Sequence, residues 1–172
     1  ITRSKISLYP CEPNHLKAVI NKLGLCGCKF EYSRHFLRII PNQILYSVDM
    51  NTSPFPGFPT DLQAPFMALM ATTTGVSKIK ETVFENRMHH VRELNRMGAK
   101  ITVKDNIAKV IGVKNLEGKK VIGSDLRGTA ALALAGLSAN GKTIVQGLEH
   151  LERGYENFSE KFQEIGATIL KK

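Results

Sequence analysis

The chain has 172 residues, of which 42% are hydrophobic and 23% are charged, and its formal net charge at pH 7 is +9. These values are typical of one globular domain that is long enough to bury a sizeable core. No apolar run approaches the ~20 residues that a membrane helix needs, so we expect no membrane partner. The positive charge favours phosphate-bearing ligands. Because basic residues do not alternate with aromatics in one run, nucleic-acid binding is the less favoured interpretation.

The cysteines and histidines show no spacing that is typical of a metal site. Cys26 and Cys28 are separated by one residue, whereas zinc and dithiol sites use C-x-x-C. The five histidines include no H-E-x-x-H pair. We therefore expect neither a metal nor a cofactor, and thiols that stay reduced. The chain starts at Ile1 and has no secretory h-region, and we expect the natural polypeptide to begin earlier.

Apolar periodicity defines the elements of the first 48 residues. The pattern predicts a strand over 3–9 and, after two prolines, a helix over 15–23. Two strands over 29–32 and 36–40 form a predicted hairpin, and 45–48 is a further predicted strand.

Residues 49–113 carry the densest turn and cap signals. Three prolines predict an extended entry before Asp61, whose carboxylate is predicted to cap a helix over 62–73 that Gly75 ends. The later predicted elements are a strand over 76–81, a helix over 86–97 that Gly98 closes, and a hairpin of 100–103 with 107–112.

The stretch from residue 114 repeats this plan. Its predicted elements are a helix over 126–137 capped by Asp125, a strand over 143–145, a helix opened by Arg153 or Tyr155 and ending at 165, and a strand over 167–170. The landmarks recur at nearly constant spacing: 64 residues from Asp61 to Asp125, 66 from Gly75 to Gly141 and from Arg87 to Arg153, and 68 from Gly98 to Gly166. We therefore predict an α/β fold of repeated strand–helix–strand–helix–strand–strand (βαβαββ) units. About two and a half units are present, at 1–48 in part, 49–113 and 114–172.

Charged side chains occupy matching positions of the repeat. Asp61 and Asp125 stand where the first helix of each unit begins, and free backbone N–H groups at such ends suit anions. Arg127 follows Asp125, and Arg87 and Arg153 stand near the start of each second helix. A guanidinium group pairs with phosphate or carboxylate at two points. We interpret the set as a candidate site for a phosphorylated ligand.

Each of these residues also has an ordinary structural interpretation. Taken singly, the aspartates are more often N-caps and the arginines are more often surface residues. Ordinary structural roles also exist for their neighbours: an ion pair of Arg87 with Glu85 or of Arg153 with Glu156, core positions for Phe84 and Tyr155, and a chance pairing of His89 with His90. The residue pattern alone leaves these interpretations open.

Five motifs, in family order, carry a resemblance to known proteins. They are PGFPTDLQ from residue 56, FENR from 84, ELNRMGA from 93, DLR from 125 and HLERGYE from 150. In these motifs the chain closely resembles the UDP-N-acetylglucosamine enolpyruvyl transferases. The resemblance is clear from about residue 50 to the end and weaker before it. The sister enzyme that acts on shikimate phosphate shares the fold but not these motifs.

The resemblance implies a fold, a reaction and a missing part. The family fold is two inside-out α/β barrels of three βαβαββ units each, so residues 1–172 would be an incomplete C-terminal domain. The reaction transfers enolpyruvyl from phosphoenolpyruvate to the 3'-hydroxyl of UDP-N-acetylglucosamine and releases phosphate, the first committed step of peptidoglycan synthesis. The implied location is the bacterial cytoplasm, with a plastid or other organelle left open. The missing N-terminal domain, or a partner chain, would cover the open barrel, and we expect the chain alone to be inactive.

The resemblance also assigns roles to individual residues. Asp61 matches the carboxylate that contacts the reacting hydroxyl as general base, and Arg153 matches an arginine that binds phosphoenolpyruvate. Asp125 is the third match to a catalytic position. The matches to substrate-binding positions are Thr60, Val83, Phe84, Arg87, Leu126 and Arg127. One departure is Met88–His89, where the family usually has an aromatic residue and then Met.

A second hypothesis is an inactive, repurposed fragment that serves as a structural or interaction module, for example in a ribonucleoprotein. The net charge of +9 and the incomplete first unit motivate it. An incomplete barrel would also expose strand edges that need a partner.

Overall fold

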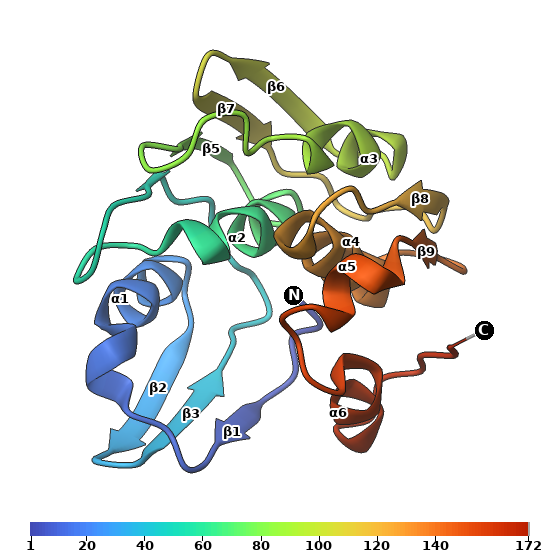
Figure 1. The fold of residues 1–172 in the computed structure, drawn as a ribbon. Coiled ribbons are helices and arrows are strands. Elements are labelled where there is room, and N and C mark those ends of the chain that lie inside the picture. Colours follow the sequence, from blue (N-terminus) through green and yellow to red (C-terminus); the bar gives the residue numbers. More distant parts are fainter. Residues whose placement is uncertain (172) are drawn as a thin grey trace.

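Two helices, α2 (Gln63–Met70) and α4 (Leu126–Ser138), pack against each other in the centre of the molecule, with three β-sheets around them (Figure 1). The computed structural model describes residues 1–171. Every residue of α2 except Pro65 is buried. A helix that is apolar on all sides has to lie inside a protein, so α2 forms the core instead of covering it.

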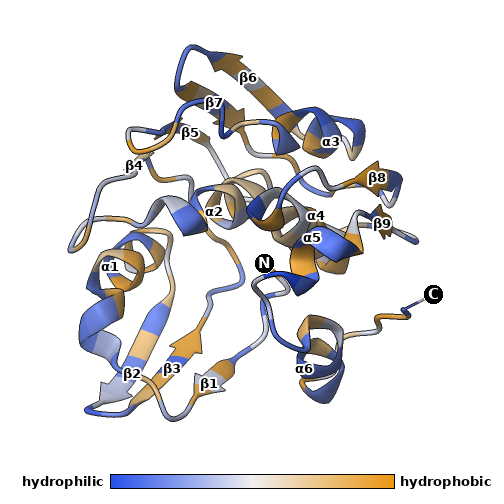
Figure 2. Cartoon of the chain, in the orientation of Figure 1, coloured by the Kyte–Doolittle hydropathy of each residue, from blue (hydrophilic) through white to orange (hydrophobic). Residues whose placement is uncertain are grey.

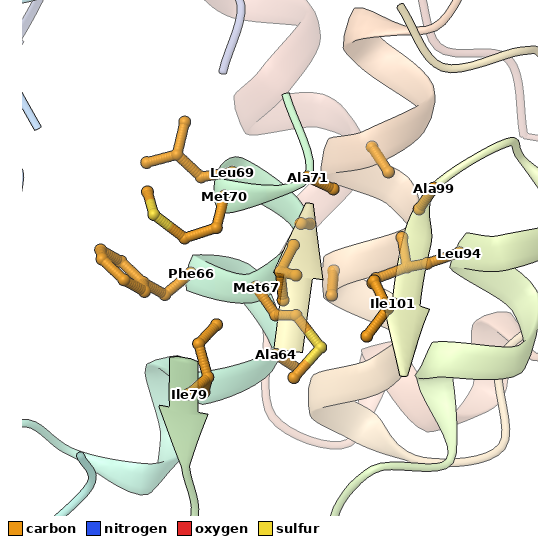
Figure 3. Packing of buried hydrophobic residues seen from close by; sticks show 14 of the residues in the cluster. Ala64, Phe66, Met67, Leu69, Met70, Ala71, Ile79, Leu94, Ala99 and Ile101 are labelled. Carbon is orange, nitrogen blue, oxygen red and sulfur yellow. The ribbon is translucent and has the colours of Figure 1, made fainter. Parts of the chain in front are cut away.

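The core is built by side chains that converge on α2 from several elements. Figure 3 shows Phe66 and Met67 of α2 together with Ile79, Leu94 and Ile101 from the surrounding strands and helix. All five are at most 5% exposed. Truncating a buried side chain of this size to alanine costs about 2–5 kcal/mol, so this packing fixes the position of α2 and of the turn that precedes it.

The second stretch of the chain forms a four-stranded sheet in the order β4-β5-β7-β6. Its strands are β4 (Met50–Asn51), β5 (Val76–Lys80), β6 (Lys100–Lys104) and β7 (Ile107–Ile111). β4 pairs with β5 in parallel, and the other two pairings are antiparallel. The hairpin predicted around residues 105 and 106 is confirmed, and Asp105 adopts the left-handed backbone (φ 54°) that its turn requires.

The first stretch forms a three-stranded antiparallel sheet in the order β1-β3-β2. It consists of β1 (Ile6–Leu8), β2 (Lys29–Ser33) and β3 (Phe36–Ile40), with a 3₁₀ turn η1 (Pro13–Leu16) and helix α1 (Lys17–Leu25) between β1 and β2. The hairpin prediction is confirmed. The strand predicted over 45–48 is wrong: the amides of Tyr46 and Ser47 donate to two different segments, Cys26 O and Thr74 O, so no continuous ladder forms.

The third stretch forms a two-stranded parallel sheet of β8 (Lys120–Ile122) and β9 (Ile144–Gln146). The helix predicted to open at Arg153 or Tyr155 and to end at 165 begins only at Phe158, as α6 (Phe158–Glu164), because Asn157 has a left-handed backbone (φ 49°). A short helix that was not predicted, α5 (Leu148–Glu152), precedes it. The strand predicted over 167–170 is also wrong. No strand of the described chain pairs with it, and the amide of Ala167 instead donates back to Phe162 O at the end of α6.

The strand pairings recur between stretches. The order β1-β3-β2, all antiparallel, matches β5-β7-β6 of the second sheet, and the parallel pair β8–β9 around α4 matches β4–β5 around α2. Helices α2 and α4 therefore occupy equivalent places, and their N-terminal ends carry the charged residues considered next. None of the helices in residues 1–171 is long and apolar enough to cross a membrane.

Candidate functional site

Asp61 lies in a 3₁₀ turn, η2 (Thr60–Leu62), that precedes α2. No side chain caps either this turn or α2, so the prediction that Asp61 is an N-cap is wrong. Its carboxylate is held by two arginines instead. Arg87 Nη2 lies 3.0 Å from Oδ1, and Arg127 Nη2 lies 2.5 Å from Oδ2. Figure 2 shows the hydrophilic starts of α2 and α4 against the paler and orange bodies of these helices.

The start of α4 is fixed by Asp125. Its Oδ1 accepts hydrogen bonds from the amides of Arg127 (3.0 Å) and Gly128 (2.8 Å), and this confirms the predicted N-cap. Such a cap stabilises a helix by about 1 kcal/mol. It also sets the first turn of α4, in which Leu126 is half-buried and the side chain of Arg127 reaches Asp61.

Arg87 comes from the loop between β5 and α3 (His90–Arg96). The helix predicted from residue 86 begins only at His90, because Asn86 has a left-handed backbone (φ 56°). Arg87 Nη1 donates to Thr60 Oγ1 at 2.9 Å, and its guanidinium carbon lies 4.7 Å from the centre of the Phe84 ring. Its acidic partner is therefore Asp61 and not the neighbouring Glu85.

Arg127 has a similar environment. Its guanidinium carbon lies 5.3 Å from the centre of the Tyr155 ring, and that ring packs edge-on against Phe158. A guanidinium group over an aromatic face gains about 0.5–1 kcal/mol where it is exposed and more where it is desolvated. Each arginine is thus oriented by a ring on one side and by the Asp61 carboxylate on another.

The charges around Asp61 favour its ionised form. Partial burial acts to raise the pKa of this carboxyl, but the hydrogen bond and charge of Arg127, together with those of Arg87, outweigh burial and hold the pKa below its usual range. The side chains of Arg87 and Arg127 are 21% and 22% exposed, whereas that of Asp61 is 50% exposed. A carboxylate and two guanidinium groups thus meet at an open surface, a combination that suits a small anion with a reactive hydroxyl beside it.

Two of the predicted site residues lie outside this cluster. Arg153 ends α5, is exposed, and forms no salt bridge within the described residues; with Tyr155 it lines an open hollow of about 490 Å³. Val83 is 39% exposed, and its amide donates to Glu81 Oε1 in the loop that also carries Arg87. Phe84 is 56% exposed and lines, with Arg87, a second hollow of about 720 Å³, so a core position is wrong for Phe84.

Sequence reasoning missed Glu81, which is buried (2% exposed) under the loop that carries Phe84 and Arg87. Its carboxylate contacts Thr60 and the loop backbone. One signal in the sequence points to it. In the strand predicted over 76–81, side chains alternate between faces, so Glu81 lies on the same buried face as Ser77 and Ile79.

His90 is a second buried polar residue that the sequence did not distinguish. It is 3% exposed, and its Nε2 has no hydrogen-bond partner. Burial lowers the pKa of His90 to about 4, although the charge of Asp125 acts in the opposite direction. The imidazole is therefore neutral at pH 7. Within residues 1–171, His, Cys, Asp and Glu side chains form no cluster of three or more that could hold a metal ion.

Comparison with protein families gives one match that covers most of the chain. The model described as "EPSP synthase (3-phosphoshikimate 1-carboxyvinyltransferase)" matches residues 1–162. A UDP-N-acetylglucosamine 1-carboxyvinyltransferase 2 of Prochlorococcus marinus is 60% identical over 99% of this chain and 40% of its own length. The enzyme named UDP-N-acetylglucosamine 1-carboxyvinyltransferase of Trichormus variabilis is 54% identical over 99% of this chain and 38% of its own length. The chain thus spans about two-fifths of these relatives.

Solved structures show the same fold. The enolpyruvyl transferase NikO from Streptomyces tendae superposes with a TM-score of 0.85 and 25% identity, over 96% of this chain and 39% of the other. EPSP synthase from Acinetobacter baumannii superposes with a TM-score of 0.70 and 17% identity, over 100% of this chain and 41% of the other. The α/β fold is therefore that of enolpyruvyl transferases, as predicted.

Proposed function

The chain belongs to the EPSP synthase family, and from this premise we propose that it supplies one side of the substrate cleft of a UDP-N-acetylglucosamine 1-carboxyvinyltransferase. The proposed reaction transfers enolpyruvyl from phosphoenolpyruvate to the 3'-hydroxyl of UDP-N-acetylglucosamine and releases phosphate. The names of relatives that are 51–60% identical over nearly all of this chain support the choice of substrate.

The observation that carries the proposal is the binding of one carboxylate, Asp61, by Arg87 and Arg127. We assign Asp61 as the general base that takes the proton of the sugar hydroxyl. Its lowered pKa keeps it ionised at neutral pH but makes it a weak proton acceptor while both arginines bind it. Anionic phosphoenolpyruvate competes for the same guanidinium groups, and its arrival frees the carboxylate to accept the proton.

The other site residues have proposed roles that fit their positions. Asp125 caps α4 and so orients Arg127, and we also assign its negative charge to the reacting centre; Leu126 forms the adjacent wall. Arg153, unpaired with any acidic side chain of residues 1–171, binds the phosphoenolpyruvate anion from the other hollow. The positions that contact the nucleotide sugar are Thr60, Val83 and Phe84.

We also propose that the chain is an incomplete C-terminal domain of inside-out α/β barrel type. Its βαβαββ units would be 1–48 in part, 49–113 and 114–172. The recurring strand pairings support this division, and the span of about 40% of the relatives' length leaves room for an N-terminal domain. The rest of the same polypeptide, or a partner chain, would complete the cleft, in the cytoplasm of a bacterium.

The comparisons do not favour the hypothesis of an inactive module in a ribonucleoprotein. The relatives are named as transferases. Arg87 and Arg127 both bind the Asp61 carboxylate, so they are not free to bind a nucleic-acid backbone. A positively charged surface alone is also the ordinary result of solvated lysines.

The intact mass of the natural polypeptide and a phosphate-release assay test the proposal together. We expect a mass more than twice the 19.1 kDa of this chain, and phosphate release that requires both substrates. We expect no turnover by the 172-residue chain alone, because the rest of the proposed cleft would lie in the part of the relatives that this chain does not span. An intact polypeptide that releases no phosphate with both substrates would contradict the proposed function.

A further inference from the structure

Glu81 connects three segments of the chain beneath the candidate site. Its Oε1 accepts hydrogen bonds from Thr52 Oγ1 (2.8 Å) and from the amides of Val83 (2.9 Å) and Phe84 (3.2 Å). Its Oε2 accepts one from Thr60 Oγ1 at 2.9 Å. All four contacts use the carboxylate as an acceptor, which is what its ionised form provides.

The position of Glu81 follows from the sheet. It comes directly after β5, beside the end of the parallel strand β4, and Thr52 comes directly after β4. The amide of Glu81 donates to Asn106 O at 2.9 Å, and Asn106 Nδ2 donates back to Glu81 O at 2.8 Å. The backbone of Glu81 is therefore held by the β6–β7 hairpin, while its side chain holds the loop and turn that carry the site.

The contact with Thr60 determines the direction of a chain of hydrogen bonds. Because the Thr60 hydroxyl donates its single proton to Glu81, its oxygen is left to accept the hydrogen bond from Arg87 Nη1. Arg87 then presents Nη2 to Asp61 Oδ1. Glu81 thus reaches the Asp61 carboxylate through Thr60 and Arg87 without touching it.

We propose that Glu81 is a positioning residue, which acts through Thr60 to hold Arg87 and Asp61 in the geometry that the reaction needs. This inference rests on the proposed function for its kinetic consequence. A carboxylate that only filled space would be an expensive choice, because burying a charge with no cation beside it costs free energy. Glutamine would fill the same volume without a charge, but its side-chain NH₂ would face the hydroxyl and amide donors that now bind the Glu81 carboxylate.

The test uses the intact polypeptide with Glu81→Gln, Thr60→Val and the double variant. Displacing reacting groups by about 1 Å costs on the order of 10²-fold, so we expect kcat to fall by about 10- to 100-fold in each single variant. Since both variants break one relay, the double variant should fall no further than about 3-fold below Glu81→Gln.

Glu93→Gln is the matched control. Glu93 is also a buried glutamate (9% exposed), but it binds Arg96 and the amide of Ile122, away from Asp61. We expect this control to change stability and leave kcat unchanged. Wild-type kcat in Glu81→Gln, or losses that multiply in the double variant, would overturn the inference while leaving the proposed function intact.

The pKa of Asp61 tests the inference independently of activity, so the test holds even if the wild-type polypeptide releases no phosphate. NMR of ¹³C-labelled aspartate measures the pKa of Asp61 in the wild type and in Thr60→Val, a change that alters no charge. Loss of the relay loosens the contact of Arg87 with Asp61, so the pKa of Asp61 should rise toward its ordinary value. An unchanged pKa would overturn the inference.

Discussion

Arg127 donates a hydrogen bond to the carboxylate of Asp61 across 66 residues of sequence. The two residues stand at the starts of α4 and of the turn before α2, and they meet because these helices pack side by side (Figure 1). Asp61 and Asp125 occupy equivalent positions of the repeat, yet only Asp125 caps its own helix. Asp61, which caps no helix, binds Arg87 and Arg127 instead.

Replacing Asp61 by Asn should abolish most of the activity of the intact polypeptide. A general base contributes about 10²–10⁴-fold, so we expect a loss of kcat in that range, measured as phosphate release. The effect on stability should stay below about 1 kcal/mol, because the Asp61 side chain is 50% exposed and its ion pairs are screened by solvent. Asp105→Asn, in the β6–β7 turn, is the control, since both residues tolerate its left-handed backbone. Full activity of the Asp61 variant would remove this residue from the mechanism.

The stability of the molecule should fall as the pH is lowered from about 6.5 to 4, because of His90. Burial lowers the pKa of His90 to about 4. Between pH 6.5 and 4 the histidine therefore binds a proton in the unfolded chain but stays neutral in the folded chain. Stability therefore rises with pH across the window, by on the order of 3 kcal/mol for a shift of about 2.5 units. Asp125, His89 and Arg87 are the charged or titratable groups that act on it.

Urea unfolding at pH 7 and pH 4.5 measures this effect. His90→Gln should flatten the pH dependence, whereas His35→Gln should leave it unchanged, because His35 is exposed and is not among the groups that act on His90. Asp61 does not interfere, since its pKa lies below its ordinary value and so below this window. Equal slopes for the wild type and His90→Gln would contradict the prediction.

Local rules predicted much of the fold because the features concerned are local. The cap at Asp125, the turn at Asp105 and the end of α3 at Gly98 depend on a few neighbouring residues, and all three are observed. The strand predicted over 167–170 failed for a different reason. A strand needs a partner to pair with, and the described chain places none beside this segment.

Asp61, Arg87 and Arg127 were predicted as candidate site residues, but their contacts with one another were not predicted. Capping rules apply to Asp61 as well as to Asp125, and only the packing of α2 against α4 shows that Asp61 faces an arginine from the first turn of α4. The equivalence of Arg87 and Arg153 in sequence likewise does not extend to space. Arg87 lies in a loop, because the left-handed backbone of Asn86 prevents a helix there. Arg153 instead directly follows α5 and is exposed.

Arg153→Ala should separate binding from folding. Because Arg153 is exposed and makes no salt bridge within residues 1–171, the free energy of unfolding should change by less than about 0.5 kcal/mol. If it binds phosphoenolpyruvate, the KM for that substrate should rise at least about 10-fold, since a hydrogen bond to a charged group is worth about 1.5–3 kcal/mol. Steady-state kinetics with each substrate varied in turn measures this, with the exposed Arg34→Ala as control. An unchanged KM would mean that Arg153 binds no phosphoenolpyruvate.

Asp125→Ser distinguishes a helix cap from a catalytic group at the same position. Serine caps helices about as well as aspartate, so the unfolding free energy should stay within about 0.5 kcal/mol of the wild type, whereas Asp125→Ala should cost about 1 kcal/mol. Serine lacks the second carboxylate oxygen and the negative charge beside Arg127. We therefore expect the activity of Asp125→Ser to fall by at least about 10-fold while its stability is kept, because a group that acts on the reacting centre cannot be replaced by a cap alone. Phosphate release and urea unfolding on the same preparations give the two quantities. Wild-type activity in Asp125→Ser with reduced stability in Asp125→Ala would identify Asp125 as a structural cap that places Arg127, and the negative charge opposite the substrate would then come from Asp61 alone.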